Sequence, residues 1–198
     1  GKNSPADIFI SVDAGKLQKA SSLDLFQKLP SEIEMTNIPK LFQDINGMWA
    51  PITYRSRILV YSNDRVDKKE LDTYESLAEE KWKNRILVRS SSNAYNQALM
   101  ASIVANSGVE AAEQWSTGIV NNLARNPKGN DRDQVKAIYS GLGDVAIVNS
   151  YYIGLLLSSD KEEERKAGES VSVFFPNQGY EQRGTHINVS GVAIVKHS

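Results

Sequence analysis

Short apolar segments alternate with helical patterns along this 198-residue chain, and this alternation is the feature that most constrains its fold. Runs rich in β-branched residues are typical of strands, and they occur at residues 8–12, 57–62, 145–149, 171–175 and 186–195. Amphipathic segments separate several of these runs. A strand–helix–strand succession of this kind predicts an α/β fold with mainly parallel sheets and flanking helices.

Two of the predicted helices begin with an acidic residue that fits a capping box. Asp72 is followed three residues later by Glu75, and Asp131 is followed three residues later by Gln134. In a capping box the side chain of the first residue accepts a hydrogen bond from the backbone N–H of the residue three positions later. The side chain of that later residue accepts one from the backbone N–H of the first. We therefore expect one helix to start near residue 72 and another near residue 131, the latter covering residues 135–139.

The composition excludes several classes of function. A formal net charge of -1 gives no electrostatic footprint for nucleic acid or for an anionic membrane. The absence of cysteine rules out disulfides, thiolate metal sites and cysteine nucleophiles together. No apolar stretch approaches the ~20 residues that a membrane-spanning helix needs. The chain therefore reads as an ordinary globular sequence, long enough for a sizeable core.

Familiar catalytic motifs are missing from the sequence. It contains no Gly-rich phosphate loop, no Gly-x-Ser-x-Gly elbow and no His-rich metal motif. The two histidines, His186 and His197, lie in or after a β-like run, where a structural role is favoured over metal ligation. Catalytic constellations are therefore thin, and an enzyme of the doubly wound class is a distant alternative.

Adjacent phenols at Tyr151 and Tyr152 follow directly on the predicted strand at residues 145–149. In open α/β sheets, ligands bind outside the carboxyl ends of the strands. A tyrosinate is an anionic oxygen ligand of the kind that hard, highly charged cations prefer. The pair is therefore a candidate metal site, although one packed ring and one exposed ring would also explain it. Asn149, just before the pair, either holds an anion beside the tyrosines or merely ends the strand.

A serine-rich segment after another predicted strand forms a second candidate site. Ser90, Ser91 and Ser92 can cap a helix that starts near Asn93. The unpaired N–H groups and the positive dipole end of a helix N-terminus favour anions. The serines could therefore cradle an oxyanion, and Tyr95 lies in the first turn of the same helix.

Taken together, these segments resemble a known family, the periplasmic ferric-iron-binding proteins of bacterial iron-uptake ABC transporters, in its tyrosine-rich branch. The resemblance runs nearly end to end, and its motifs are specific as a set rather than one by one. They lie at residues 6–15, 49–61, 74–82, 89–97, 129–134, 149–152, 174–177 and 184–191.

The resemblance implies a two-lobed fold that closes around Fe(III). Its tandem tyrosines bind the ion, which corresponds to Tyr151 and Tyr152 here, and the tyrosine-rich branch adds Tyr95. The arginine that faces the metal or a carbonate-like companion anion lies in an Arg-x-Arg strand. This points first to Arg55 and then to Arg57.

The resemblance also implies how the chain is divided. Residues 1–54 and 184–198 would form a partial first lobe, and residues 55–183 would form the second lobe. The family's first βα unit, with a further Tyr or His ligand, precedes the part that matches Gly1, and its members continue past Ser198. We therefore expect an internal piece of a longer family member.

A ferric-iron-binding role implies delivery of iron to an inner-membrane ABC permease. The location would be periplasmic, or lipid-anchored outside the inner membrane. The alternative on the same scaffold is a protein that binds another small oxyanion or a polyol, with Arg55, the serine segment and the tyrosines as hydrogen-bond donors. Visible colour on adding Fe(III) separates the two, because only metal-bound phenolate gives a charge-transfer band.

Overall fold

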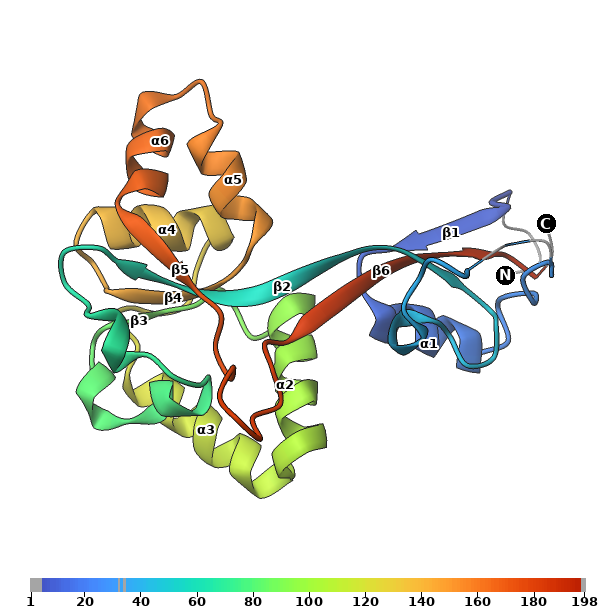
Figure 1. The fold of residues 1–198 in the computed structure, drawn as a ribbon, viewed down its shortest axis with the longest axis horizontal. Coiled ribbons are helices and arrows are strands. Elements are labelled where there is room, and N and C mark those ends of the chain that lie inside the picture. Colours follow the sequence, from blue (N-terminus) through green and yellow to red (C-terminus); the bar gives the residue numbers. More distant parts are fainter. Residues whose placement is uncertain (1–4, 32, 34, 197–198) are drawn as a thin grey trace. The chain divides into compact units, whose positions relative to one another are not determined.

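A computed structural model describes residues 5–196 of the chain, apart from residues 32 and 34. The chain forms two compact units (Figure 1): unit 1 consists of Gly1–Arg55 and Ile187–Ser198, and unit 2 of Ser56–His186. These boundaries place Arg55 in unit 1 and residues 184–186 in unit 2. The sequence analysis had assigned each of them to the other part.

Unit 1 is a small sheet with one α-helix. Strand β1 (Ile8–Ser11) pairs antiparallel with β6 (Ile187–Ile194), and the first residues of β2 (Ala50–Ser62) also belong to this unit. Helix α1 (Ala14–Ser22) begins at Asp13, whose side chain accepts a hydrogen bond from the backbone N–H of Lys16 at 3.0 Å. A short 3-10 turn, η1, spans Lys40–Phe42. The core of this unit consists of Leu17, Ala20, Phe26, Trp49, Val189 and Ala193.

In unit 2 the sheet combines both strand directions. Strand β4 (Val145–Asn149) pairs antiparallel with β2 and parallel with β3 (Ile86–Leu87), while β5 (Val171–Phe174) pairs antiparallel with β2. The chain enters unit 2 along β2 and leaves it again after β5, and these two strands run in opposite directions. The α/β class is confirmed, but the expectation of mainly parallel sheets is wrong for these pairs.

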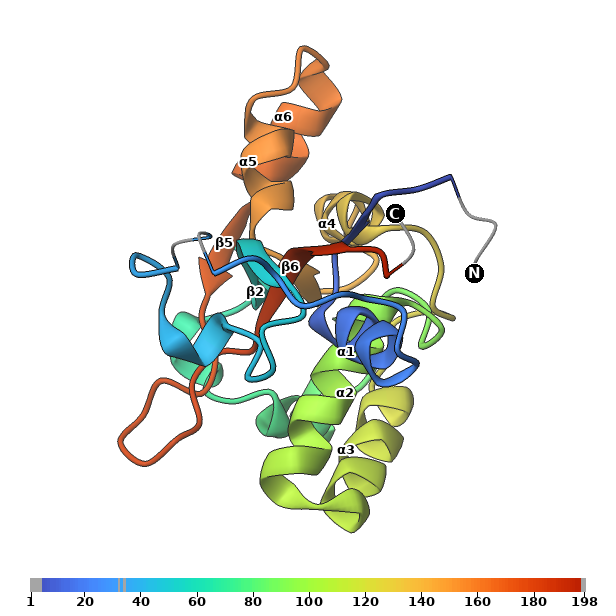
Figure 2. The ribbon, with the colours of Figure 1, turned by 90° about the vertical axis from the view of Figure 1, so that its right-hand side faces the viewer.

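Helices cover the sheet of unit 2 on both sides (Figure 1). Figure 2 shows α2 and α3 side by side. In the described part of the chain, no helix is both long and apolar enough to cross a membrane. The helices on one side are α2 (Ala94–Ser107) and α3 (Val109–Asn121), and those on the other are α4 (Asp131–Tyr139), α5 (Tyr151–Leu157) and α6 (Glu162–Glu169).

The central strands of unit 2, β2 and β4, are buried on both faces. Side chains alternate along a strand, so neighbouring residues enter different cores. Leu59 and Ile147 pack with α2 and α3, whereas Ile58 and Val148 pack with α4 and α5. Burial on both faces explains why the strand sequences are continuously apolar instead of alternating.

Residues 75–78 and 80–82 form 3-10 turns, so the α-helix expected from Asp72 and Glu75 is absent there. The reciprocal bonds are made by Thr73 and Ser76 instead: each backbone N–H donates to the other's hydroxyl, at 3.3 and 3.0 Å. The segment is shaped by burial of Trp82, which is 0% exposed, more than by helical periodicity. The turns are η2 (Lys68–Glu70) just before it, η3 (Glu75–Ala78) and η4 (Glu80–Trp82).

The buried hydroxyl of Tyr74 joins two segments of unit 2. It donates a hydrogen bond to the carbonyl oxygen of Arg57 and accepts one from the backbone N–H of His186 at 3.2 Å. The N–H of Arg57 in turn donates to the carbonyl oxygen of His186 at 2.9 Å. Burial raises the pKa of the Tyr74 phenol, so it remains a neutral donor at physiological pH. This hydroxyl therefore holds β2 against the segment that leads into β6.

We predict that Tyr74→Phe lowers the free energy of unfolding by about 1–3 kcal/mol, because the carbonyl of Arg57 and the N–H of His186 lose a buried partner. Urea denaturation should show a lower midpoint at an unchanged m-value. Tyr180→Phe is the matched control: Tyr180 is 96% exposed, and substitutions at such sites stay within about 0.5 kcal/mol. Equal midpoints for the two variants would contradict this role of Tyr74.

Candidate functional site

Tyr151 and Tyr152 are the first two residues of α5, directly after the buried strand β4. The N–H of Ser150, between the strand and the helix, donates to the carbonyl oxygen of Ser56 at 3.0 Å, which anchors the turn to β2. The two tyrosine rings lie with their centroids 4.2 Å apart and their planes inclined by 32°. Tyr151 is 39% exposed, so the pair is accessible to a ligand.

Tyr95 joins this pair from the first turn of α2. The side chains of Tyr152 and Tyr95 lie close enough to the Tyr151 hydroxyl that both raise its pKa. Tyr95 is held at the helix start by Asn93, the N-cap, whose side chain accepts from the backbone N–H of Tyr95 at 3.0 Å. The structure therefore brings together three phenols from two distant segments of the sequence.

The surroundings of Tyr151 favour its protonated form. Burial raises the pKa of the Tyr151 hydroxyl, and hydrogen bonding to Tyr152 and Tyr95 raises that pKa further. The side chain of Asn149 acts in the opposite direction and favours the phenolate. Without a metal ion, Tyr151 is therefore a neutral phenol at neutral pH, and a bound cation has to displace its proton.

Arg57 in β2 lies beside the tyrosine cluster and is almost completely buried. Its Nη1 donates to Asp131 Oδ2 at 2.6 Å and to Asn149 Oδ1 at 3.2 Å, and its Nη2 donates to Asn96 Oδ1 at 2.6 Å. Burial lowers the pKa of this guanidinium, while the carboxylate of Asp131 raises it. The side chain stays cationic in this pairing.

Two arginines lie over the ring of Tyr95. The guanidinium carbons of Arg57 and Arg89 are 6.0 and 5.6 Å from its centroid, distances at which a cation is attracted to an aromatic face. Arg89 Nη1 also donates to Asp131 Oδ1 at 3.2 Å. Two guanidinium groups thus share one carboxylate, which leaves one net positive charge beside the phenols.

Arg55, the arginine that the resemblance favours, belongs to unit 1. There it is buried, and its Nη1 donates to the hydroxyl of Ser190 at 2.6 Å. Within unit 2, Arg57 and Arg89 are the arginines that contact Tyr95.

Ser90, Ser91 and Ser92 form an exposed turn ahead of α2. The hydroxyls of Ser90 and Ser92 are 2.8 Å apart, and the backbone N–H of Ser92 donates to the Ser90 hydroxyl at 3.2 Å. The cap of the helix is Asn93, so the expectation that the serines cap it is wrong. An amide side chain directly before the helix takes the position that the sequence pattern gave to the serines.

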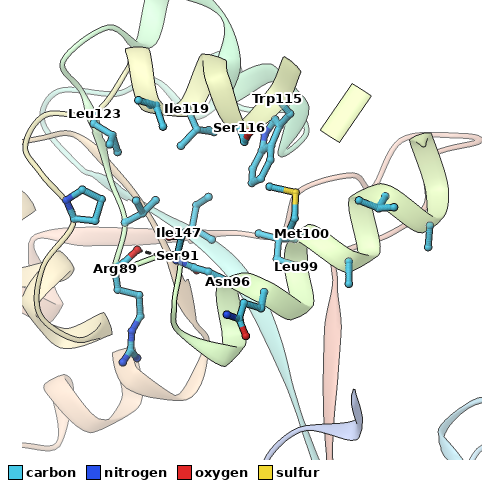
Figure 3. A pocket seen from close by; sticks show the side chains of 17 residues that line it. Arg89, Ser91, Asn96, Leu99, Met100, Trp115, Ser116, Ile119, Leu123 and Ile147 are labelled. Atoms are coloured by element: carbon cyan, nitrogen blue, oxygen red, sulfur yellow. Dashed lines mark hydrogen bonds between the residues drawn. The ribbon is translucent and has the colours of Figure 1, made fainter. Parts of the chain in front are cut away.

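A cavity of about 680 Å³ opens between α2 and α3 (Figure 3). Its walls are mostly apolar side chains, and Arg89 extends away from them. None of the described residues that line it is a tyrosine. The cavity is therefore separate from the phenol cluster. Its larger lining side chains are Leu99, Met100, Trp115, Ile119, Leu123 and Ile147.

Asp131 is the main residue of this region that the sequence reasoning missed. The capping box of α4 lies one residue earlier than expected: Asn130 accepts from the N–H of Asp133 at 3.3 Å, and Asp133 accepts from the N–H of Asn130 at 2.7 Å. Asp131 is therefore free of capping and is 0% exposed in the arginine cluster. An acidic residue in a first helical turn is ordinary, so no sequence signal marked its burial.

The histidines take no part in the phenol cluster as described. His186 contributes its backbone to the contacts with Tyr74 and Arg57. His197 lies outside the described residues.

Comparison with known proteins places this site in a family. The family model described as bacterial extracellular solute-binding protein matches residues 3–180. The chain belongs to this family. Iron uptake protein A1 of Synechocystis is 47% identical over 196 residues, which cover 99% of this chain and 54% of that protein. The chain thus spans little more than half the length of the curated relatives it matches.

Solved structures of this solute-binding family superpose closely. Apo FutA2 of Synechocystis is 46% identical with a TM-score of 0.94, covering 100% of this chain and 63% of that one. The Trichodesmium protein FutA (IdiA), solved in complex with iron and citrate ligands, is 44% identical with a TM-score of 0.92, covering 100% of this chain and 62% of that one. The fold of the described residues is therefore that of the ferric-binding relatives.

We predict that Tyr151 ionises only above the range near pH ~10 in which a free tyrosine titrates. In an alkaline titration followed by phenolate absorbance, Tyr151→Phe should remove absorbance only at the most alkaline end, because burial and the neighbouring hydroxyls raise the pKa of this phenol. Circular dichroism has to show that the chain is still folded at each pH. Loss of absorbance in the ordinary tyrosine range would contradict the shift.

Proposed function

We propose that this chain binds Fe(III) and supplies three phenolate ligands to it, from Tyr95, Tyr151 and Tyr152. The observation that carries the proposal is the placement of the paired Tyr151 and Tyr152 rings at the start of α5, with Tyr95 at the start of α2 near enough to raise the pKa of Tyr151. Three phenolates neutralise the three charges of the ion, and hard cations prefer anionic oxygen donors. The iron and citrate ligands of the Trichodesmium relative support the choice of ion.

The mechanism is an exchange of protons for the ion. The raised pKa of Tyr151 keeps that phenol neutral before binding, and a trivalent cation stabilises phenolate strongly enough to expel phenol protons. Acidification therefore favours release, since each phenolate must regain a proton before the site empties. Reduction to Fe(II) removes one charge from the ion and weakens its hold on the three ligands.

The net positive charge beside Tyr95 also suits an anion next to the metal. Arg57 and Arg89 outnumber Asp131, so the cluster either stabilises the phenolate directly or balances a carbonate-like companion anion. Other side chains that the resemblance and the sequence pattern offer for this anion are Arg55, Ser90, Ser91, Ser92 and Asn149.

The wider role that we propose is that of a two-lobed iron-binding protein, with unit 2 as its second lobe. It would work in the periplasm, free or lipid-anchored outside the inner membrane, and deliver iron to an inner-membrane ABC permease. The names of two Synechocystis relatives, iron uptake proteins A1 and A2, support this role. The match to extracellular solute-binding proteins supports the location.

We predict that the double variant Tyr151→Phe/Tyr152→Phe loses the visible tyrosinate–Fe(III) band. Loss of a residue that only supports a metal ligand typically weakens metal binding about 10–100-fold. The affinity of the double variant for Fe(III) should fall by more than this, because it loses the ligands themselves. The rings stay in place and the oxygens are lost. Tyr95→Phe should weaken binding less, because water can fill one position.

Tyr180→Phe serves as the control, since this exposed tyrosine lies outside the cluster. It should keep both the colour and the affinity. Full colour and full affinity in the double variant would rule out the tandem tyrosines as ligands. A protein that binds an oxyanion or a polyol but never colours with Fe(III) would support the alternative function.

A further inference from the structure

We propose that Asp131 is a positioning residue for the tyrosine cluster: its buried carboxylate holds the side chains behind Tyr95 and Tyr151 without touching the ion. Its effect on iron rests on the proposed function. Its effect on the tyrosines rests on the contacts of the metal-free protein.

The carboxylate of Asp131 joins the middle of β2, the end of β4 and the segment after β3. Its Oδ2 accepts from Arg57 Nη1 at 2.6 Å and from the backbone N–H of Asn149 at 2.7 Å, and its Oδ1 accepts from Arg89 Nη1 at 3.2 Å. Arg57 and Asn149 are direct partners in the β2–β4 pairing, and Arg89 follows β3. One side chain at the start of α4 thus contacts residues of β2 and β4 and of the segment that follows β3.

The link from Asp131 to Tyr95 runs through both arginines. Each guanidinium lies over the Tyr95 ring while one of its nitrogens is bound to Asp131. Asn96, the residue after Tyr95, accepts from Arg57 Nη2 at 2.6 Å and donates to the carbonyl oxygen of Arg89 at 2.8 Å. The first turn of α2 is therefore held from two sides by groups that Asp131 orients.

The link from Asp131 to Tyr151 runs through Asn149. Asp131 binds the backbone N–H of Asn149, and Arg57 binds its side-chain Oδ1 at 3.2 Å. Because the Oδ1 atom of Asn149 faces Arg57, the Nδ2 atom of the same amide points away from Arg57. This buried Nδ2 has no acceptor at normal hydrogen-bond geometry among the described residues. Asp131 therefore holds the end of β4 at Asn149, two residues before Tyr151 at the start of α5.

A buried ion pair can also serve folding alone, so the test needs a matched pair. Asp144 provides it. Its carboxylate also takes two arginines, Arg65 Nε at 2.6 Å and Arg85 Nε at 2.7 Å, but it precedes β4, at the opposite end of the strand from Asn149. Asp131→Asn and Asp144→Asn thus make the same chemical change at the two ends of one strand.

The first measurement uses the iron-free 198-residue chain labelled with fluorotyrosine. Tyr95→Phe and Tyr151→Phe assign the two fluorine signals, and circular dichroism establishes that each variant is folded. We expect Asp131→Asn to shift both signals and Asp144→Asn to leave both in place. Unshifted signals in folded Asp131→Asn would overturn the proposal, whether or not the chain binds iron.

The second measurement is a titration with ferric citrate followed at the tyrosinate band. We expect Asp131→Asn to weaken Fe(III) binding by about 10–100-fold, as for other partners behind a metal's ligands. Asp144→Asn should bind as the wild type does. Equal affinities in the two variants would overturn the proposal. If the wild type gives no band, the proposed function fails, and the fluorine signals alone decide whether Asp131 positions the tyrosines.

Asp131→Asn leaves two arginines without their carboxylate, which is destabilising and can prevent folding. If Asp131→Asn does not fold, the double variant Arg57→Met/Asp131→Asn replaces it in both measurements. This double variant removes one positive and one negative charge, so the net charge of the cluster is unchanged. We expect a folded chain with shifted tyrosine signals and the same loss of affinity. Wild-type fluorine signals and wild-type Fe(III) affinity in this variant would overturn the proposal. The net charge of the cluster, and not the Asp131 carboxylate, would then determine both properties.

Discussion

The antiparallel pairing of β2 with β4 is the constraint on which the site depends. Both strands are buried on both faces, so a slip of one residue would move each side chain into the wrong core. The register sets Arg57 opposite Asn149 and ends β4 just before the tyrosine pair. The position of the phenols is therefore a consequence of core packing, and the polar network is built on that frame.

Electrostatics then decides what the cluster can hold. Burial and the neighbouring phenols raise the pKa of Tyr151, which keeps this phenol protonated at neutral pH. Only an ion that stabilises several phenolates at once compensates for the loss of their protons. The arginines behind Tyr95 add positive charge at the same place, with Asp131 fixing where that charge lies.

Part of this arrangement was predictable from the sequence. The tyrosine pair was placed at a strand end because an apolar run and a helix start flank it, whereas Tyr95 was added through family resemblance. Capping boxes were misplaced because overlapping frames fit the same rule: Asn130 with Asp133 and Asp131 with Gln134 both have the required spacing. Burial chose between them, and burial depends on contacts between distant segments. For the same reason no sequence pattern predicts that Arg57 and Arg89 share the carboxylate of Asp131.

The most direct test is a crystal structure of the iron-loaded chain with anomalous scattering recorded at the iron edge. The account predicts one strong iron peak within bonding distance of the oxygens of Tyr95, Tyr151 and Tyr152, with Asp131 in the arginine cluster and outside bonding distance of the peak. An iron peak at another place, or one that these phenol oxygens do not reach, would contradict the central claim.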